Sequence, residues 1–268
     1  MPADDLALLE AAAQAAGEIA NRHFEGPRTA RDKPGGQGPV TDADLEIDGM
    51  LRAELGASRP DYGWLSEETE DDKRRLSAKR VFVVDPIDGT RAFIAGRRSW
   101  GHALAVVEAG NVTAGVVHMP RLARTYTASL GAGAHCNGAP IAPSDRADAA
   151  GATALVSRSH LAPERWPGGA PALEPHFCPS LAYRICLAAE GRYDAALTLR
   201  PAWEWDVAAA TLIAAEAGAG VSDADGARLI FNNPVPKLAG VMVAGPELYA
   251  DLIERRAPPT GRMAGRRH

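Results

Sequence analysis

The stretch Val81-Phe82-Val83-Val84-Asp85-Pro86-Ile87-Asp88-Gly89-Thr90 decides the fold around it, because it joins a strand to a turn and a helix. Its four leading apolar residues predict a buried strand. The turn that follows gathers two carboxylates, a backbone carbonyl and a hydroxyl, which are hard oxygen ligands of the kind that Mg²⁺ prefers. Asp, Pro and Gly are also common turn residues, so this stretch taken alone also allows a purely structural turn.

Acids also lie beside apolar runs at two other positions in the sequence. Their presence favours a binding site over a purely structural turn. Glu67 and Glu68 follow a short predicted strand at 62–66, and Trp205-Asp206 opens a later predicted helix. Carboxylates placed together repel unless a cation neutralises them. Backbone amides at the start of a helix, here at Gly89 and Thr90, can hold an anion beside that cation. The pattern indicates a metal ion paired with a phosphate.

Hydrophobic periodicity outlines the rest of the chain. It predicts helices at 4–24, from 41 or 42 to 55, at 180–190 and at 206–217. It predicts strands at 62–66, 81–84, 101–108, 112–119, 125–129, 154–157, 195–198 and 239–243. Residues 31–39 are rich in Pro, Gly and charge and predict a mobile loop. The alternation of strands and helices in the second half of the chain predicts layers of helix and sheet.

A change of composition marks a domain boundary near residues 141–150, where Pro, Ser, Asp and Ala predominate. We therefore divide the chain into an N-terminal half at 1–143, a C-terminal half at 144–254 and a tail at 255–268. The tail holds five Arg and no acid, and it is rich in Pro and Gly, so we expect it to be disordered.

Net charge limits the partners. The formal charge of the whole chain is −5, and removal of the five tail arginines leaves −10 for residues 1–254. So acidic a body lacks the electrostatic footprint of a nucleic-acid binder. The first residues are acidic and no apolar run approaches the length of a membrane span, so we expect a cytoplasmic protein with no membrane partner.

The two acidic turns belong to a longer set of segments. The set comprises Pro39-Val40-Thr41-Asp42-Ala43-Asp44, Trp64-Leu65-Ser66-Glu67-Glu68, Asp85-Pro86-Ile87-Asp88-Gly89-Thr90, Gly133-Ala134-His135-Cys136-Asn137-Gly138, Trp205-Asp206-Val207-Ala208-Ala209-Ala210 and Glu216-Ala217-Gly218-Ala219. Because these segments occur in this order and with this spacing, the chain resembles the inositol monophosphatase family of Mg²⁺-dependent, lithium-sensitive phosphatases. The resemblance extends from the first helix to about Glu254. The resemblance implies a homodimer that acts on a small phosphorylated metabolite.

The resemblance also refines the expected fold. We expect an α/β layered (αβαβα) sandwich, in which the N-terminal α+β half has a largely antiparallel sheet and holds most of the metal ligands. The C-terminal α/β half, with a mixed sheet, is expected to contribute Asp206 and the wall that contacts the substrate.

The family's motif assigns metal ligands to the matching residues. Glu67, Asp85 and the Ile87 carbonyl would bind a first Mg²⁺, and Asp85, Asp88 and Asp206 a second. The resemblance also allows a weaker third ion near Glu67. Metal ions so placed would activate the attacking water and stabilise the leaving oxygen.

Other positions carry over catalytic roles. Asp44 with Thr90 would orient or deprotonate the attacking water beside Glu67, and the amides of Gly89 and Thr90 would hold the phosphate. Asp42 competes with Asp44 for this role, although its position also suits a helix cap.

Substrate identity stays open at this point. Ser180-Leu181-Ala182 stands where inositol monophosphatases have a Gly-Thr-Ala type of turn. The segment at 180–191, with Glu204-Trp205-Asp206, looks more like the 3′(2′),5′-bisphosphate nucleotidases of the same superfamily. Arg91-Ala92-Phe93-Ile94-Ala95-Gly96 resembles its histidinol-phosphate phosphatases. A protein that binds a phosphorylated metabolite without turning it over is the alternative from another class.

Predicted substrate contacts follow from these comparisons of segments. They are Gly89, Thr90, Ser180, Arg184 and Glu204. Further arginines that could reach a substrate phosphate are Arg97, Arg98, Arg158 and Arg200, although each also suits a solvated surface.

Overall fold

The computed structural model describes residues 2–33 and 38–257. Within them, the α-helices are α1 (Pro2–Glu25), α2 (Asp42–Ser58), α3 (Thr90–Ile94), α4 (Leu181–Ala189), α5 (Glu204–Glu216) and α6 (Pro246–Arg256). Single 3₁₀ turns occur at Arg74–Ser77, Pro120–Leu122, Arg158–Leu161 and Pro163–Arg165.

A seven-stranded sheet forms the N-terminal part of the molecule. Its order is β3-β4-β5-β6-β7-β8-β9, and all neighbours are antiparallel except β3 and β4. The strands are β3 (Gly63–Ser66), β4 (Arg80–Asp88), β5 (Gly101–Glu108), β6 (Asn111–Met119), β7 (Arg124–Ser129), β8 (Ala134–Cys136) and β9 (Ala139–Pro140).

A five-stranded mixed sheet follows, in the order β11-β10-β12-β16-β14. Its strands are β10 (Thr153–Leu155), β11 (Glu174–His176), β12 (Ala195–Thr198), β14 (Gly220–Ser222) and β16 (Val241–Ala244). Two antiparallel ribbons complete the structure: β1 (Ala30–Asp32) with β2 (Pro39–Thr41), and β13 (Ala202–Trp203) with β15 (Lys237–Leu238).

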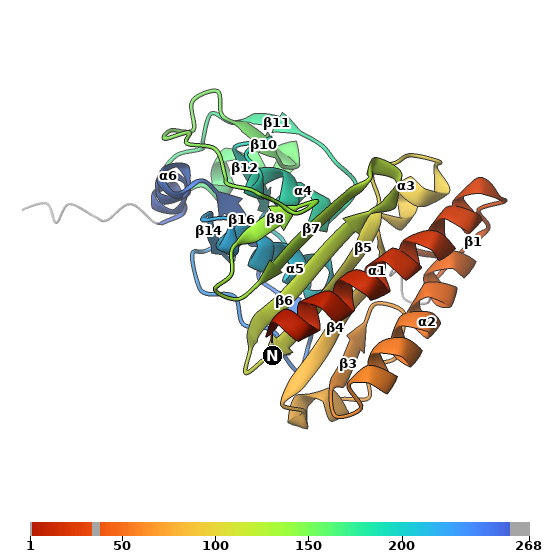
Figure 1. Cartoon of the computed structure of the whole chain (residues 1–268). Helices are drawn as coiled ribbons and strands as arrows, with labels where there is room; N and C mark the ends of the chain where they lie inside the picture. The colour runs from red at the N-terminus through yellow and green to blue at the C-terminus, as the bar shows by residue number, and fades with distance from the viewer. Residues whose placement is uncertain (1, 34–37, 258–268) are drawn as a thin grey trace, which may run out of the picture.

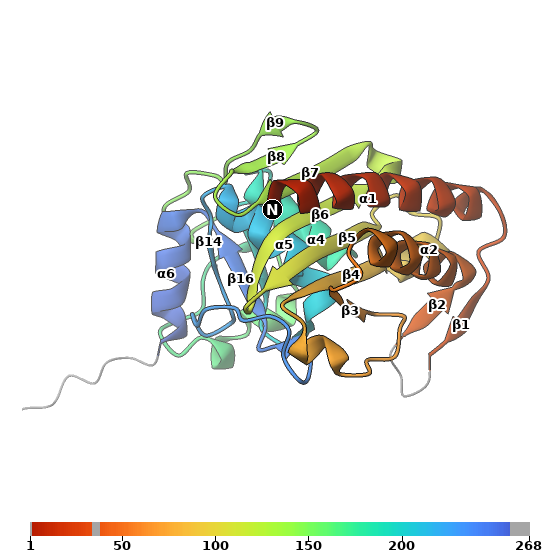
Figure 2. The same cartoon turned by 60° about the horizontal axis from the view of Figure 1, so that its bottom comes forward.

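The elements stack in five layers (Figure 1). α1 and α2 cover one face of the seven-stranded sheet, and α4 and α5 lie between the two sheets. α6 covers the outer face of the five-stranded sheet, as the turned view also shows (Figure 2). This arrangement confirms the predicted αβαβα sandwich with a largely antiparallel first sheet and a mixed second sheet.

The central layer explains the composition of α5. A helix that is apolar on all sides must be buried on all sides, and residues 207–214 are all buried between the sheets. Contact with β6 is close, because a Cβ added at Gly115 would lie 2.9 Å from the Ala209 carbonyl oxygen. Among the described helices, none is long and apolar enough to cross a membrane.

Some local expectations differ from the structure. Residues 31–39 were expected to form a loop, but Ala30–Asp32 pairs with Pro39–Thr41 as a short ribbon. The basic tail was expected to begin at Arg255, yet α6 continues through Arg256, whose guanidinium pairs with Asp225. The remaining tail, 258–268, lies outside the described residues. The division of the chain at residues 143 and 144 stays a prediction.

Candidate active site

The end of β4, where the sequence predicted a turn, presents two acids through an extra residue in the strand. Asp85 pairs with Ala103 on β5 and Asp88 pairs with Gly101, so three steps along β4 match two steps along β5. Residues three apart in a regular strand point to opposite faces, and a bulge of one residue removes that difference. Pro86, which has no N–H for the ladder, lies within the bulge. Both carboxylates can therefore face the same side of the sheet.

The chain changes direction at Gly89. Its φ of +95° lies in the left-handed region that glycine adopts without steric cost, and it forms the N-cap of α3. A Cβ here would also lie 3.2 Å from the Ser99 carbonyl oxygen. Gly89 and Thr90 both line a cavity, so the residues predicted to bind phosphate lie at its wall.

Three carboxylates from distant parts of the sequence converge at this cavity. Glu67 directly follows β3, Asp85 lies in β4, and Asp206 lies in the first turn of α5. One oxygen of each lies within 4.8 Å of the other two. Asp85 is only 1% exposed, and its Oδ1 has no hydrogen-bond partner among the described residues. Converging oxygens with a free lone pair match the donors that a hard divalent cation prefers.

The environment of these carboxylates disfavours their negative charges. Burial and the charges of Glu67 and Asp88 raise the pKa of Asp85 well above its usual range. Burial and the charges of Asp88 and Glu67 likewise raise the pKa of Asp206 well above its usual range. A divalent cation would offset both penalties. The cluster of Glu67, Asp85 and Asp206 therefore fits a metal ion.

The N-terminus of α4 holds Asp88. Its Oδ2 accepts hydrogen bonds from Ser180 Oγ at 2.5 Å and from Ala182 N at 2.7 Å, and its Oδ1 accepts one from Leu181 N at 3.1 Å. Burial raises the pKa of Asp88 to about 6, although these hydrogen bonds oppose the shift. These hydrogen bonds fix the orientation of Asp88, a predicted metal ligand. They come from residues 180–182, which lie far along the chain from β4.

Ser180 has a different role from the expected one. Its side chain is fully buried, and it is absent from the cavity lining. Its Oγ donates to Asp88 and accepts from Tyr183 N at 3.0 Å, which makes it the N-cap of α4. The structure therefore corrects the expected substrate contact: Ser180 positions Asp88 instead.

Asp44 lies beside Thr90, as the predicted pairing requires. Asp44 Oδ2 accepts hydrogen bonds from Thr41 N at 2.8 Å and Thr41 Oγ1 at 2.5 Å, which closes a capping box at the start of α2. Thr90 Oγ1 lies 3.4 Å from Asp44 Oδ1 and 3.0 Å from the Ile87 carbonyl oxygen. Burial raises the pKa of Asp44 to about 6. Asp42 is exposed, and Thr41 rather than Asp42 caps the helix.

Lys33 joins the site, which the sequence did not predict. Its Nζ lies 2.7 Å from one oxygen each of Glu67 and Glu68. Burial lowers the pKa of Lys33, but the charges and hydrogen bonds of these two acids outweigh it and raise the pKa overall. Burial raises the pKa of Glu68 to about 7, and Lys33 opposes the shift. No local sequence signal indicates this pairing, because 34 residues separate Lys33 from Glu67.

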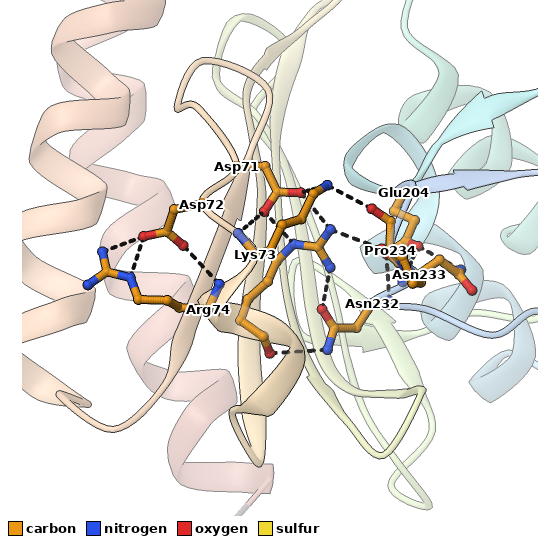
Figure 3. A network of polar contacts seen from close by, with 9 residues as sticks. Asp71, Asp72, Lys73, Arg74, Glu204, Asn232, Asn233 and Pro234 are labelled. Carbon is orange, nitrogen blue, oxygen red and sulfur yellow. Dashed lines mark hydrogen bonds and ion pairs between the residues drawn. The ribbon is translucent and has the colours of Figure 1, made fainter.

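Glu204 also differs from its predicted role as a substrate contact. It is fully buried, and its carboxylate accepts hydrogen bonds from Asn232 N at 2.6 Å, Asn233 N at 2.9 Å and Asn233 Nδ2 at 2.7 Å (Figure 3). Residues two apart on a helix point in nearly opposite directions, so Glu204 faces away while Asp206 faces the carboxylate cluster. Glu204 holds the 232–233 segment against the start of α5.

A buried arginine links this segment to the loop after β3. Arg75 donates to both oxygens of Asp71 at 3.0 and 2.7 Å, to Asn232 Oδ1 at 2.6 Å and to the Asn233 carbonyl at 2.9 Å. Its side chain has no exposed surface. The loop that carries Glu67 is thereby tied to the segment that holds α5. The sequence gives no sign of this network, because Arg75 and Asn232 are 157 residues apart.

The cavity over the carboxylates has a volume of about 740 Å³. Four arginines among the described residues line it, namely Arg91, Arg97, Arg184 and Arg200. The acids of the described lining are Glu67, Asp85, Asp88 and Asp206, all predicted metal ligands. Within the described part of the chain, Arg91, Arg97 and Arg200 are exposed and form no ion pair. Arg98 instead donates to the Arg121 carbonyl, and Arg158 is absent from this lining.

One aromatic side chain completes the wall. Phe177 is 69% exposed and lines the cavity. The Arg184 guanidinium carbon lies 4.9 Å from the centre of the Phe177 ring, and Arg184 Nε donates to the carbonyl of Cys178. Phe177 follows β11 directly and was not singled out from the sequence.

Comparison with known proteins agrees with this fold. The model of the inositol monophosphatase family matches residues 3–257. The chain is 32% identical to a histidinol-phosphatase of Mycobacterium tuberculosis, with 84% of this chain and 90% of the relative aligned. It is 33% identical to a 3′-phosphoadenosine 5′-phosphate phosphatase of Mycobacterium leprae, which covers 93% of this chain and 92% of the relative. The solved structure of an IMPase from Thermotoga maritima superposes with a TM-score of 0.79 at 26% identity, covering 96% of this chain and 97% of the other.

The layered fold, the carboxylate cluster and these matches define a phosphatase, whose class of reaction is the hydrolysis of phosphomonoesters. The chain belongs to the inositol monophosphatase family. Members of this family are generally metal-dependent and act on small phosphorylated molecules, and the acidic cluster found here suits a metal ion.

Proposed function

We propose that this protein is a Mg²⁺-dependent phosphomonoesterase whose substrate carries a second anionic group. The observation that carries the proposal is the meeting of three carboxylates in a cavity whose other charged lining residues are arginines. Bound Mg²⁺ would supply Lewis acidity toward the attacking water, the phosphoryl oxygens and the leaving oxygen. The residues proposed to hold two or three ions are Glu67, Asp85, Ile87 through its carbonyl, Asp88 and Asp206.

Asp44 and Thr90 are the proposed base and its relay. Thr90 lines the cavity whereas Asp44 does not, so Asp44 would act through the Thr90 hydroxyl. The attacking water would give its proton to Thr90 Oγ1 while the hydroxyl proton passes to Asp44 Oδ1. A pKa of about 6 leaves Asp44 largely ionised at neutral pH and able to accept it. Glu67 would orient the same water from the metal side.

The amides of Gly89 and Thr90 are proposed to bind the phosphoryl group that is transferred. Backbone N–H groups at the start of a helix favour anions. The positive φ of Gly89 lets the chain turn into the helix at this point. Specificity must come from the rest of the cavity, since this part would treat any phosphomonoester alike.

The arginines support a substrate with additional negative charge. Arg91, Arg97 and Arg200 have no acidic partner within the described part of the chain, so an anionic substrate group would find cations already free to pair. Among the described lining residues, every acid belongs to the proposed metal site, so none is left to pair with the amine of histidinol phosphate. We therefore propose a 3′(2′),5′-bisphosphonucleotide as the leading substrate, with inositol monophosphate second and histidinol phosphate as the alternative.

Phosphate release from a panel of substrates tests the proposal. We expect Mg²⁺-dependent hydrolysis of adenosine 3′,5′-bisphosphate with a catalytic efficiency at least about tenfold above those of inositol 1-phosphate and histidinol phosphate, because each well-placed charged contact contributes on the order of one decade. Inhibition by Li⁺ provides a second readout. A preference for inositol 1-phosphate would refute the proposal that the substrate carries a second anionic group.

A binding protein without turnover is the competing class of function. It would bind adenosine 3′,5′-bisphosphate yet release no phosphate with or without Mg²⁺. The presence of Asp44, Thr90 and the whole predicted ligand set favours an enzyme. A cytoplasmic location and a homodimer remain predictions, and light scattering of the purified protein tests the second.

A further inference from the structure

An exposed aromatic ring lines the cavity that holds the carboxylate cluster. Phe177 is 69% exposed and lines the same cavity as Asp85, Asp88 and Asp206. Aromatic side chains contribute large apolar surfaces that are normally covered. A ligand that covers this ring would gain apolar burial at the place where it also meets the site's charges.

The ring is held in place from both directions along the chain. Its predecessor His176 ends β11, which pairs with β10, and Ser180 three residues later is anchored on Asp88. Arg184 lies 4.9 Å from the ring centre and is itself fixed to the Cys178 carbonyl. This cation–π contact occupies one face of the ring. The exposed fraction indicates that the other face is available.

We propose that Phe177, supported by Arg184, stacks on the planar base of the substrate and so selects nucleotides over sugar bisphosphates. The inference rests on the proposed phosphatase function and names a specificity-determining residue for it. Stacking on an aromatic ring suits a nucleobase because every base has a π face, whereas a saturated sugar ring has none. The cavity of about 740 Å³ can hold a ligand of nucleotide size.

The choice of base should be loosely defined. Stacking alone does not read hydrogen-bond donors and acceptors, so adenine and guanine nucleotides are expected to bind with similar affinity. Selectivity should appear instead between substrates with and without a base.

The test compares Phe177→Leu with Phe177→Tyr and wild type on adenosine 3′,5′-bisphosphate and on fructose 1,6-bisphosphate. Leu keeps an apolar side chain but removes the π face, and Tyr keeps the ring. We expect Phe177→Leu to raise KM for the nucleotide roughly tenfold more than KM for the sugar bisphosphate. Phe177→Tyr should retain most of the nucleotide selectivity. Leu130→Ala, which removes an exposed apolar side chain outside the cavity, is the matched control.

Binding measurements separate this inference from the proposed function. Calorimetry with adenosine 3′,5′-bisphosphate in Ca²⁺, another hard divalent cation, reports affinity without relying on turnover. Weaker binding by Phe177→Leu, but not by Phe177→Tyr, supports the stacking role even if the wild type fails to hydrolyse the nucleotide. Equal binding by all three proteins, or an equal loss on both bisphosphates, would overturn it.

Discussion

The Ser180 hydroxyl donates a 2.5 Å hydrogen bond to Asp88 Oδ2 across 92 residues of sequence. Ser180 also caps α4, so one side chain fixes both the helix start and a proposed metal ligand. Outer hydrogen-bond partners of metal ligands typically set the geometry of the ligands themselves. The affinity of the site for metal should therefore depend on a residue that does not touch the cavity.

Ser180→Ala should weaken Mg²⁺ binding while the catalytic groups stay in place. We expect the Mg²⁺ concentration for half-maximal activity to rise about tenfold, as is usual when such a partner is lost. Calorimetric titration of Mg²⁺ provides the same number without turnover. Ser180→Thr, which keeps the hydroxyl, and Ser77→Ala, which removes an exposed one, serve as controls. An unchanged Mg²⁺ requirement in Ser180→Ala would contradict the positioning role.

Asp85→Asn should abolish turnover without unfolding the chain. Loss of the charge at the centre of the carboxylate cluster is expected to lower the rate at least about 10²-fold. In EDTA the variant should be no less stable than wild type, because it removes a buried charge that other acids repel. Added Mg²⁺ should raise the melting temperature of wild type but hardly that of the variant. Wild-type rates of phosphate release would reject the assignment.

Arg75→Met should destabilise the fold, because it removes the buried guanidinium that pairs with Asp71 and donates to Asn232 and Asn233. Breaking a buried charged network typically costs about 3–5 kcal/mol of unfolding free energy. Hydrogen bonds from Arg75 and Lys73 outweigh burial and hold the pKa of Asp71 well below its usual range, which shows how far this carboxylate depends on its partners. Denaturant unfolding measures the loss. Arg74→Met, at an exposed neighbour paired with Asp72, should change stability little.

Two buried histidines, His118 and His102, should make the free energy of unfolding depend on pH under acidic conditions. Burial lowers the pKa of His118 to about 4 and that of His102, stacked 6.0 Å away, to about 3. Both rings stay neutral in the folded chain but take up protons in the unfolded chain below about 6.5. Their contribution to stability is therefore complete above pH 6.5 and is lost as the pH falls toward 4.

A His118→Asn variant tests this dependence. Between pH 6 and 4.5 its unfolding free energy should fall less steeply than that of wild type, by up to about 1.4 kcal/mol per pH unit. Urea unfolding at several pH values gives the two slopes. Parallel slopes would show that His118 does not carry the effect.

Backbone structure that is set by neighbours in sequence was predicted in part. The strand that begins at Val81 and the turn at Gly89 follow from a run of apolar residues and a Gly. The strand was predicted to end at Val84, but β4 continues through Asp88, so both acids lie in the strand. The convergence of Glu67, Asp85 and Asp206 was predicted from the family resemblance, and the structure brings them together.

Two features limited the prediction of the other site residues: the direction in which a side chain points, and the distance in sequence between residues that contact each other. Ser180 and Glu204 lie in segments that were correctly predicted to adjoin the site. The direction of each side chain depends on its position around the helix, and both point toward protein partners. Lys33, Arg75 and Phe177 gave no signal. Their partners, or the cavity that exposes them, form only when segments far apart in sequence have packed.

The Arg75 network has a consequence for the order of synthesis. A ribosome delivers the β3 loop long before residues 232–234, and domains form from the N-terminus as the chain emerges. Until Asn232 and Asn233 have left the ribosome, Arg75 lacks two of its hydrogen-bond acceptors, and the Glu204 carboxylate lacks the donors of these two residues. The carboxylates of the cluster thus reach their final spacing only in a nearly finished chain, so a nascent or truncated protein is expected to have neither the metal site nor its activity.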